Sequence, residues 1–231
     1  MRRKGPETDR NPLIVALDRP DLDGAEDLAR RLAGAAGMLK VGLELFVANG
    51  PVAVHRVRAH GPVFLDLKLH DIPTTVGRAA RAAGALGPTM LTVHALGGEV
   101  MVRAAVDGVE QGADAGGFDP PAVIAVTVLS SVGGESLASP ASLAFEAVTA
   151  GAAGVVVSGE DVREVREALG DGPIVVVPGV RPAGFGSNDH VRVLTPREAL
   201  GAGADHLVVG RPVTEASDPA AAARMVLAEI G

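Results

Sequence analysis

The chain has 231 residues, of which 47% are hydrophobic and 21% are charged, and its formal net charge is -7. This composition is typical of a globular protein, and the acidic balance argues against a nucleic-acid surface built on bulk positive charge. The absence of Cys excludes disulfides, thiolate nucleophiles and Cys-ligated zinc sites.

Short β-branched apolar runs alternate along the chain with longer Ala-rich amphipathic segments. The expected strands lie at 13–17, 38–42, 63–67, 89–94, 122–129, 154–158, 173–177 and 206–210. The expected helices lie at about 23–35, 43–60, 74–86, 98–111, 139–151, 160–169, 195–202 and 218–230. Such alternation predicts a parallel sheet, and at this length it fits a single (β/α)8 TIM barrel; a doubly wound open sheet is the alternative on pattern alone.

Residues 1–12 are expected to form a solvated tail, because no apolar segment of the kind that a secretory signal needs follows their basic residues. Residues 13–231 are expected to form one barrel domain, since no linker or charge block divides them. No apolar run approaches the roughly 18 residues of a membrane span. We therefore expect a cytoplasmic protein without a membrane or nucleic-acid partner.

Three of the predicted helices end in the same Ala-Gly-Ala turn directly before a strand, at 83–85, 150–152 and 202–204. A glycine at this place commonly ends a helix in the left-handed region. The turns precede strands instead of following them, so they are not dinucleotide-binding fingerprints.

The third strand and its loop, FLDLKLHDIP from Phe64 onward, carry an unusual number of charges for a buried segment. Side chains alternate along a strand, so Asp66 and Lys68 should share the face that points into the barrel mouth while the leucines meet the helices. Asp18 and Lys40, at the ends of the neighbouring strands, are placed to join them. A structural ion-pair network is the alternative, although buried ion pairs often stabilise no better than apolar replacements.

Carboxylates around Lys68 favour an ammonium over a free amine. An ammonium argues against a Schiff-base nucleophile, which needs a neutral lysine. It is instead suited to stabilising a developing carbanion and to delivering a proton to it. Asp71 lies beyond the strand, on the loop that leads to a helix starting near Pro73.

The loops after the seventh and eighth strands have the composition of a phosphate site. Gly210 lets the backbone approach a ligand closely, and Arg211 offers a fork that matches phosphate oxygens. These two loops commonly hold phosphate in a (β/α)8 barrel. Taken alone, the Gly-Arg pair could equally be a surface turn.

FLDLKLHDIPTT resembles the D-x-K-x-x-D-I-P signature of the orotidine 5′-phosphate decarboxylase family. Further matching segments, in the expected order, are IVALD, LKVGLELF, LTVHALGG, VTVLSS, VPGVRPAG and VVGRPVT, so the resemblance extends from about residue 13 to residue 214. Sister barrels, namely 3-keto-gulonate-6-phosphate decarboxylase and hexulose-phosphate synthase, share D-x-K-x-x-D. The segments I-P-T-T, P-G-V-R-P and G-R-P-V-T point to the orotidylate branch.

The resemblance implies decarboxylation of orotidine 5′-monophosphate to UMP in pyrimidine biosynthesis, by a homodimer that uses no metal and no cofactor. It implies three catalytic residues: Lys68 to stabilise and protonate the C6 carbanion, Asp66 beside the departing carboxylate, and Asp71 donated across the dimer interface. The substrate-binding residues that it implies are Asp18, Lys40, Ile72, Thr75, Ser130, Val180, Arg181, His190, Gly210 and Arg211. Of these, Asp18 and Lys40 would bind ribose, Ser130 would read the pyrimidine, and Gly210 with Arg211 would hold the phosphate.

His190 stands where the family usually has Gln, in the segment NDHVRVLTP. A neutral imidazole offers one donor and one acceptor, so we hypothesise that His190 takes over the bridge between phosphate and pyrimidine. The KM should then fall as the pH drops through the histidine pKa, and a His190→Gln enzyme with an unchanged pH–KM curve would refute this. Asn188 is the alternative bridging residue.

Two other functions stay open at this point. One is a metal-dependent sugar-phosphate decarboxylase or aldolase of the same superfamily, in which Glu44 and Asp66 could bind Mg²⁺. The other is a non-catalytic phosphate-binding barrel that serves as a regulator or scaffold.

Overall fold

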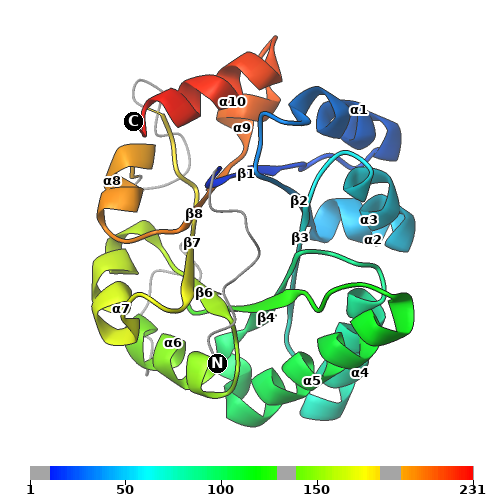
Figure 1. Cartoon of the computed structure of the whole chain (residues 1–231), viewed down its shortest axis with the longest axis vertical. Coiled ribbons are helices and arrows are strands. Elements are labelled where there is room, and N and C mark those ends of the chain that lie inside the picture. The colour runs from blue at the N-terminus through cyan, green and yellow to red at the C-terminus, as the bar shows by residue number, and fades with distance from the viewer. Residues whose placement is uncertain (1–10, 129–138, 183–193, 231) are drawn as a thin grey trace.

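The computed structural model describes residues 11–128, 139–182 and 194–230. Its strands form one closed barrel in the order β1 to β8, surrounded by helices, as Figure 1 shows. Neighbouring strands are parallel, and β8 pairs with β1 to close the ring. The predicted (β/α)8 barrel is confirmed. Ser130, His190 and Asn188 lie outside the described residues, and the proposed boundary between tail and barrel stays a prediction.

The strands are β1 (Leu13–Ala16), β2 (Met38–Gly42), β3 (Val63–Leu69), β4 (Met90–His94), β5 (Ala122–Val126), β6 (Gly154–Val156), β7 (Ile174–Pro178) and β8 (His206–Val209). The α-helices are α1 (Leu22–Leu32), α2 (Leu43–Asn49), α3 (Pro51–Arg58), α4 (Pro73–Gly84), α5 (Gly98–Gly116), α6 (Pro140–Thr149), α7 (Val162–Leu169), α8 (Pro196–Gly201), α9 (Arg211–Thr214) and α10 (Pro219–Ala228). Two short 3-10 helices, η1 (Ala95–Gly97) and η2 (Gly159–Asp161), precede α5 and α7.

Several helices begin at residues whose side chains satisfy the free backbone N–H groups of the first turn. The side chains of Asp21, Ser139, Thr195 and Asp218 each accept such a hydrogen bond, and in the last three cases a proline occupies the next position. These caps fix where the helices start, and hence how long the preceding loops are.

The predicted helix at 43–60 is wrong as a single element, because the structure divides it into α2 and α3. Gly50 has a φ of 68° and Pro51 opens the second helix, so the backbone cannot continue in helical geometry between them. The Ala-Gly-Ala turns are confirmed at Gly151 and Gly203, which have φ angles of 107° and 110°. In the first of these turns Gly84 is still helical, and Gly87 takes the positive φ instead.

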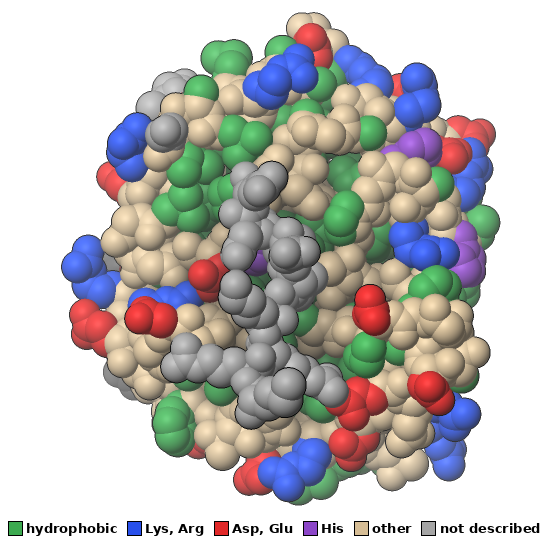
Figure 2. Space-filling model, viewed as in Figure 1, with side chains coloured by type: hydrophobic (Ala, Val, Ile, Leu, Met, Phe, Trp, Pro, Cys, Tyr) green, Lys and Arg blue, Asp and Glu red, His purple; other side chains and the backbone are tan. Residues whose placement is uncertain are grey.

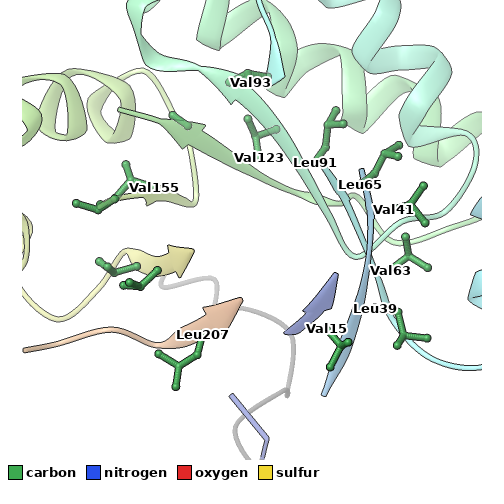
Figure 3. Close-up of a cluster of buried hydrophobic side chains, with 14 of the residues drawn as sticks. Val15, Leu39, Val41, Val63, Leu65, Leu91, Val93, Val123, Val155 and Leu207 are labelled. Atoms are coloured by element: carbon green, nitrogen blue, oxygen red, sulfur yellow. The ribbon is translucent and has the colours of Figure 1, made fainter. Parts of the chain in front are cut away.

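The strands bury apolar side chains on both faces. The outward side chains pack against the helices, and Figure 3 draws several of them pointing away from the barrel interior. The inward side chains form a separate cluster inside the barrel: Ile14, Ala16, Met38, Phe64, Met90, Ile124, Val176 and Val208. This inner cluster is the apolar floor beneath the carboxyl ends of the strands.

On the face drawn in Figure 2, acidic and basic side chains are interspersed around the rim. Among the residues that the structure describes, none of the helices combines the length and the apolar character that crossing a membrane requires.

Candidate active site

Polar side chains form a layer directly above the apolar floor, because every second side chain of a strand points to the same side. Lys40 stands two residues beyond Met38, and Asp66 stands two residues beyond Phe64, both of which belong to the inner cluster. Residues two apart on a strand point to the same side, so these polar side chains point into the mouth of the barrel. Asp18, two residues beyond Ala16, reaches the same region from the end of β1.

Asp66 is the centre of the polar layer, and it is 9% exposed. Lys68 Nζ lies 2.8 Å from Asp66 Oδ1, and Lys40 Nζ lies 3.5 Å from Asp66 Oδ2. Lys40 Nζ also lies 3.2 Å from Asp18 Oδ1. The structure therefore brings together four of the predicted site residues, with Lys40 between two carboxylates.

The electrostatics of Asp66 follow from this geometry. Burial by itself raises the pKa of the Asp66 carboxyl, but the charges of Lys40 and Lys68 and the hydrogen bonds from Lys68 and Thr92 outweigh burial and hold the pKa below its ordinary value. Asp66 is therefore a carboxylate at neutral pH, although it is largely removed from water.

The backbone at Lys68 departs from regular strand geometry. Leu65 pairs with Leu91 and Leu69 pairs with Val93, so β3 carries two more residues than β4 between these points. Within this bulge Lys68 has a φ of 50°, and it is the one residue other than glycine with a positive φ in the described part of the chain. Such a conformation is costly for a lysine and persists only where neighbouring contacts hold it.

The predicted phosphate residues lie at the ends of β7 and β8. Gly210 caps the short helix α9, and Arg211 is its exposed first residue. Val180 is buried behind β7, and the N–H of Arg181 donates to the carbonyl of Leu194 at 3.1 Å. Because β8 neighbours β1, Gly210 and Asp18 follow adjacent strands, so these residues lie around one mouth of the barrel.

A family model described as "Orotidine 5'-phosphate decarboxylase / HUMPS family" matches residues 11–226. The chain belongs to this family. An orotidine 5′-phosphate decarboxylase from Anaeromyxobacter dehalogenans is 52% identical over 227 residues, which is 94% of this chain and 96% of that protein. One from Moorella thermoacetica is 49% identical over 233 residues, covering 96% of this chain and 92% of that protein.

Two solved structures are similar to this chain over nearly its whole length. The crystal structure of orotidine 5′-phosphate decarboxylase from Lactobacillus acidophilus is 37% identical and covers 96% of this chain and 99% of its own, with a TM-score of 0.82. An uncharacterized conserved protein from Geobacillus kaustophilus is 34% identical with a TM-score of 0.81, over 95% of this chain and all of that one.

Thr92 is a site residue of this family member that the sequence analysis missed. It lies on β4, two residues beyond Met90 of the apolar floor, and it is 0% exposed. Its hydroxyl donates to Asp66 Oδ1 at 3.0 Å and accepts the backbone N–H of Lys68 at 2.8 Å. The spacing of two between Met90, Thr92 and His94 could have predicted this position, because it places all three side chains on the inner face of one strand.

Two histidines pack beside the charged cluster. His70 and His94 stack with their ring centroids 5.1 Å apart, and Nδ1 of His94 accepts the backbone N–H of Leu96 at 3.4 Å. Burial, and then the charges of His70 and Lys68, lower the pKa of His94 below its ordinary value. His94 is therefore neutral at neutral pH and fits a structural role.

Asp71, Ile72 and Thr75 are exposed, on the loop after β3 and the first turn of α4. Asp71 Oδ1 accepts the backbone N–H of Ile72 at 2.6 Å. Within the described ranges, no ion pair links Asp71 to Lys68 or to Lys40. The structure of the single chain thus leaves the third predicted catalytic residue outside the cluster.

No cluster of three or more His, Cys, Asp or Glu side chains suited to a metal ion occurs in the described part of the chain. Glu44 is exposed at the start of α2. The position between Asp18 and Asp66, where a cation would balance two carboxylates, is taken by the ammonium of Lys40.

Proposed function

We propose that this protein decarboxylates orotidine 5′-monophosphate to UMP, with Lys68 as the group that stabilises and protonates the reaction centre. The observation that carries the proposal is the ammonium of Lys68, held 2.8 Å from the buried carboxylate of Asp66 at the mouth of the barrel. The names of the relatives support the same substrate.

The chemistry requires one bond to break and one to form. The bond between C6 of the pyrimidine and its carboxylate breaks, CO₂ leaves, and the electron pair stays on C6. The positive charge of Lys68 stabilises this pair, and its ammonium then transfers a proton to C6 to give UMP. Solvent returns a proton to Lys68 after the product leaves.

Asp66 has two roles in this scheme. It holds the ammonium of Lys68 in place through the 2.8 Å contact, and it would lie beside the carboxylate that departs. Asp18 and Lys40 would bind the ribose hydroxyls, while Gly210, Arg211, Val180 and Arg181 would surround the phosphate. Phosphate binding distant from the ring can lower the barrier to reaction, because binding energy gained there is used in the transition state. Ser130 and His190 complete the predicted set, outside the described residues.

The position of Lys40 favours the orotidylate reaction over the metal-dependent sugar-phosphate alternative. A divalent cation shared by Asp66 and a second carboxylate would have to compete with an ammonium that already lies 3.5 Å from Asp66. Removing or displacing one partner of a buried charge pair is costly.

The direct test is an absorbance assay with orotidine 5′-monophosphate in the presence of EDTA. We expect turnover to UMP that EDTA does not diminish, because the proposed mechanism needs no metal and no cofactor. Loss of activity with EDTA, restored by Mg²⁺, would favour the sugar-phosphate branch. No turnover at all, with nucleotide binding intact, would favour a non-catalytic barrel.

The expected cytoplasmic location stays a prediction.

We further propose that the enzyme acts as a homodimer in which Asp71 enters the partner's site. Asp71 is exposed, it accepts the N–H of Ile72, and within the described residues no ion pair joins it to Lys68 of its own chain. Exposed apolar side chains follow β2, β3 and β4 on the same end of the barrel; they are Leu43, Val47, Ile72, Leu96 and Val100. Clustered exposed apolar residues commonly mark protein interfaces. Ile72 and Thr75 would accompany Asp71 across this interface.

Subunit complementation tests the shared site. Lys68→Ala and Asp71→Ala should each be nearly inactive alone. When the two variants exchange subunits at equal amounts, half of the dimers carry one intact site out of two, so about a quarter of wild-type activity should return. If Asp71 served its own chain, every site would keep one defect and no activity would return.

A further inference from the structure

We propose that Thr92 is the positioning residue of the Asp66–Lys68 pair, an inference that rests on the function proposed above. The Thr92 hydroxyl donates to Asp66 Oδ1 at 3.0 Å and accepts the backbone N–H of Lys68 at 2.8 Å. Lys68 Nζ in turn donates to the same Oδ1 at 2.8 Å. The three residues therefore form a closed ring of hydrogen bonds.

The direction of each bond in this ring is determined. A threonine hydroxyl has one proton and two lone pairs, and the backbone N–H of Lys68 can only donate. The hydroxyl must accept from Lys68, which leaves its single proton for the carboxylate of Asp66. Thr92 is thus the neutral donor from β4 to Asp66, beside the charged donor Lys68 from β3 and the ion-pair partner Lys40 from β2.

The ring explains how the bulge in β3 is held. The bulge interrupts the ladder between β3 and β4 at the point where Thr92 lies between Leu91 and Val93. The N–H of Lys68 bonds to the Thr92 side chain, and this contact supports a φ of 50° that a lysine otherwise adopts only at a cost. A bulge next to a site commonly redirects a side chain, and here it returns Lys68 toward Asp66.

Thr92 acts through its neighbours, because it is 0% exposed and lies below the mouth. Its burial keeps it away from substrate, so its removal should change the rate of the chemical step more than substrate binding. The hydrogen bond from Thr92 also contributes to the low pKa of Asp66. Removing it should make Asp66 easier to protonate.

The test compares Thr92→Val, which keeps the shape and loses the hydroxyl, with Thr92→Ser, which keeps the hydroxyl. For Thr92→Val we expect kcat to fall about 10- to 100-fold, as for a lost hydrogen bond to a charged group. The KM should change by less than about threefold, and the acid limb of the pH–kcat profile should move to higher pH. Thr92→Ser should restore kcat to within about threefold of wild type. If Thr92→Val does not fold, Thr92→Ala carries the same comparison.

Thr127→Val is the matched control. Thr127 is also fully buried, at the end of the adjacent strand β5, and its hydroxyl donates to the carbonyl of Val156 at 3.1 Å. This variant loses a comparable buried hydrogen bond without touching Asp66 or Lys68, so its kcat should stay within about threefold of wild type. An equal loss in Thr127→Val, or no rescue by Thr92→Ser, would mean that the barrel top has merely loosened and would overturn the proposal.

Two readouts separate this proposal from the proposed function. Wild-type turnover with an unaffected Thr92→Val would overturn the positioning role alone, whereas no wild-type turnover would overturn the function. A crystal structure of Thr92→Val tests the geometry without reference to activity. We expect Lys68 Nζ to leave hydrogen-bond reach of Asp66 Oδ1, beyond about 3.5 Å. An unchanged bulge with the contact intact would contradict the proposal.

Discussion

Lys40→Met removes the cation between Asp18 and Asp66 while keeping a side chain of similar length. In the wild type Lys40 Nζ lies 3.5 Å from Asp66 Oδ2, and both side chains are 12% exposed. Two unit charges about 4 Å apart attract by about 4 kcal/mol at an effective dielectric constant of about 20. Breaking a buried pair costs about 3–5 kcal/mol when nothing else compensates the remaining charge.

Lys68 still neutralises Asp66 in this variant, so the loss of unfolding free energy should lie at or below the lower end of the range of about 3–5 kcal/mol. We expect the free energy of unfolding to drop by about 2–3 kcal/mol near neutral pH, which is large against a total of about 5–15 kcal/mol. The contact with Asp18 adds little, because the Asp18 side chain is 61% exposed.

The pH dependence is a second, independent signature. The pKa of Asp66 in the folded protein lies below its ordinary value, so its ionisation contributes stability that is complete above the unfolded-state pKa and is lost as the pH falls through the folded-state pKa. Lys40→Met raises the folded-state pKa of Asp66. The destabilisation should therefore be complete near neutral pH and should shrink only as the pH falls below about 4, where Asp66 of the wild type becomes protonated.

The assay is urea denaturation followed by far-ultraviolet circular dichroism, since the chain has no Trp or Tyr to report by fluorescence. Protein concentration is kept constant, because dimerisation would add to apparent stability. Arg30→Met is the control: it breaks the exposed pair with Asp27 and should cost at most about 0.5 kcal/mol. A Lys40→Met enzyme as stable as wild type, or one destabilised as much well below pH about 4 as at neutral pH, would contradict this prediction.

Two further predictions concern the scaffold. Arg166 donates to the carbonyls of Gly170, Pro173 and Gly203 and to Asp205, so Arg166→Met should lower the free energy of unfolding by about 2–4 kcal/mol in urea denaturation. Arg163→Met, at an exposed position of the same helix, should have little effect, and equal losses would contradict this role. A Cβ added at Gly154 would lie 2.1 Å from a backbone oxygen of β7, so Gly154→Ala should cost about 3 kcal/mol or more. Gly172→Ala, where nothing lies within 4 Å, should be near neutral, and a similar melting temperature for both variants would show that β6 can shift.

Much of the fold and the charged cluster followed from periodicity in the sequence. Alternating strand and helix patterns are local signals, so eight units could be placed before any contact was known. The period of two along a strand was enough to place Asp66 and Lys68 on one inward face, and the strand order was enough to bring Asp18 and Lys40 beside them.

Register and backbone strain could not be predicted in this way. The sequence around Lys68 contains no glycine that would signal a positive φ, so neither the bulge nor the φ of 50° was foreseeable. Parity along β4 could have placed Thr92 on the inner face, but its hydrogen bonds could not be predicted, because they depend on which residue of β4 lies opposite the bulge. The break between α2 and α3 was readable in principle, since Gly50 is followed directly by Pro51.

The role of Asp71 is another feature that one chain by itself does not reveal. A signature motif placed it among the catalytic residues, yet in the isolated chain it contacts the backbone of Ile72 and not the charged cluster. A residue that works across an interface has its partner in a second copy, which neither periodicity nor the fold of one chain describes.

The catalytic role of Lys68 is tested most directly by measuring orotidine 5′-monophosphate decarboxylation and UMP binding side by side in wild type and Lys68→Ala. We expect kcat to fall at least about 1,000-fold in Lys68→Ala, because the charge that stabilises the carbanion and the proton that quenches it are lost together. The dissociation constant for UMP should change by less than about tenfold, since UMP has no departing carboxylate for Lys68 to act on. Substantial turnover by a folded, UMP-binding Lys68→Ala enzyme would show that Lys68 is not the group that stabilises and protonates C6.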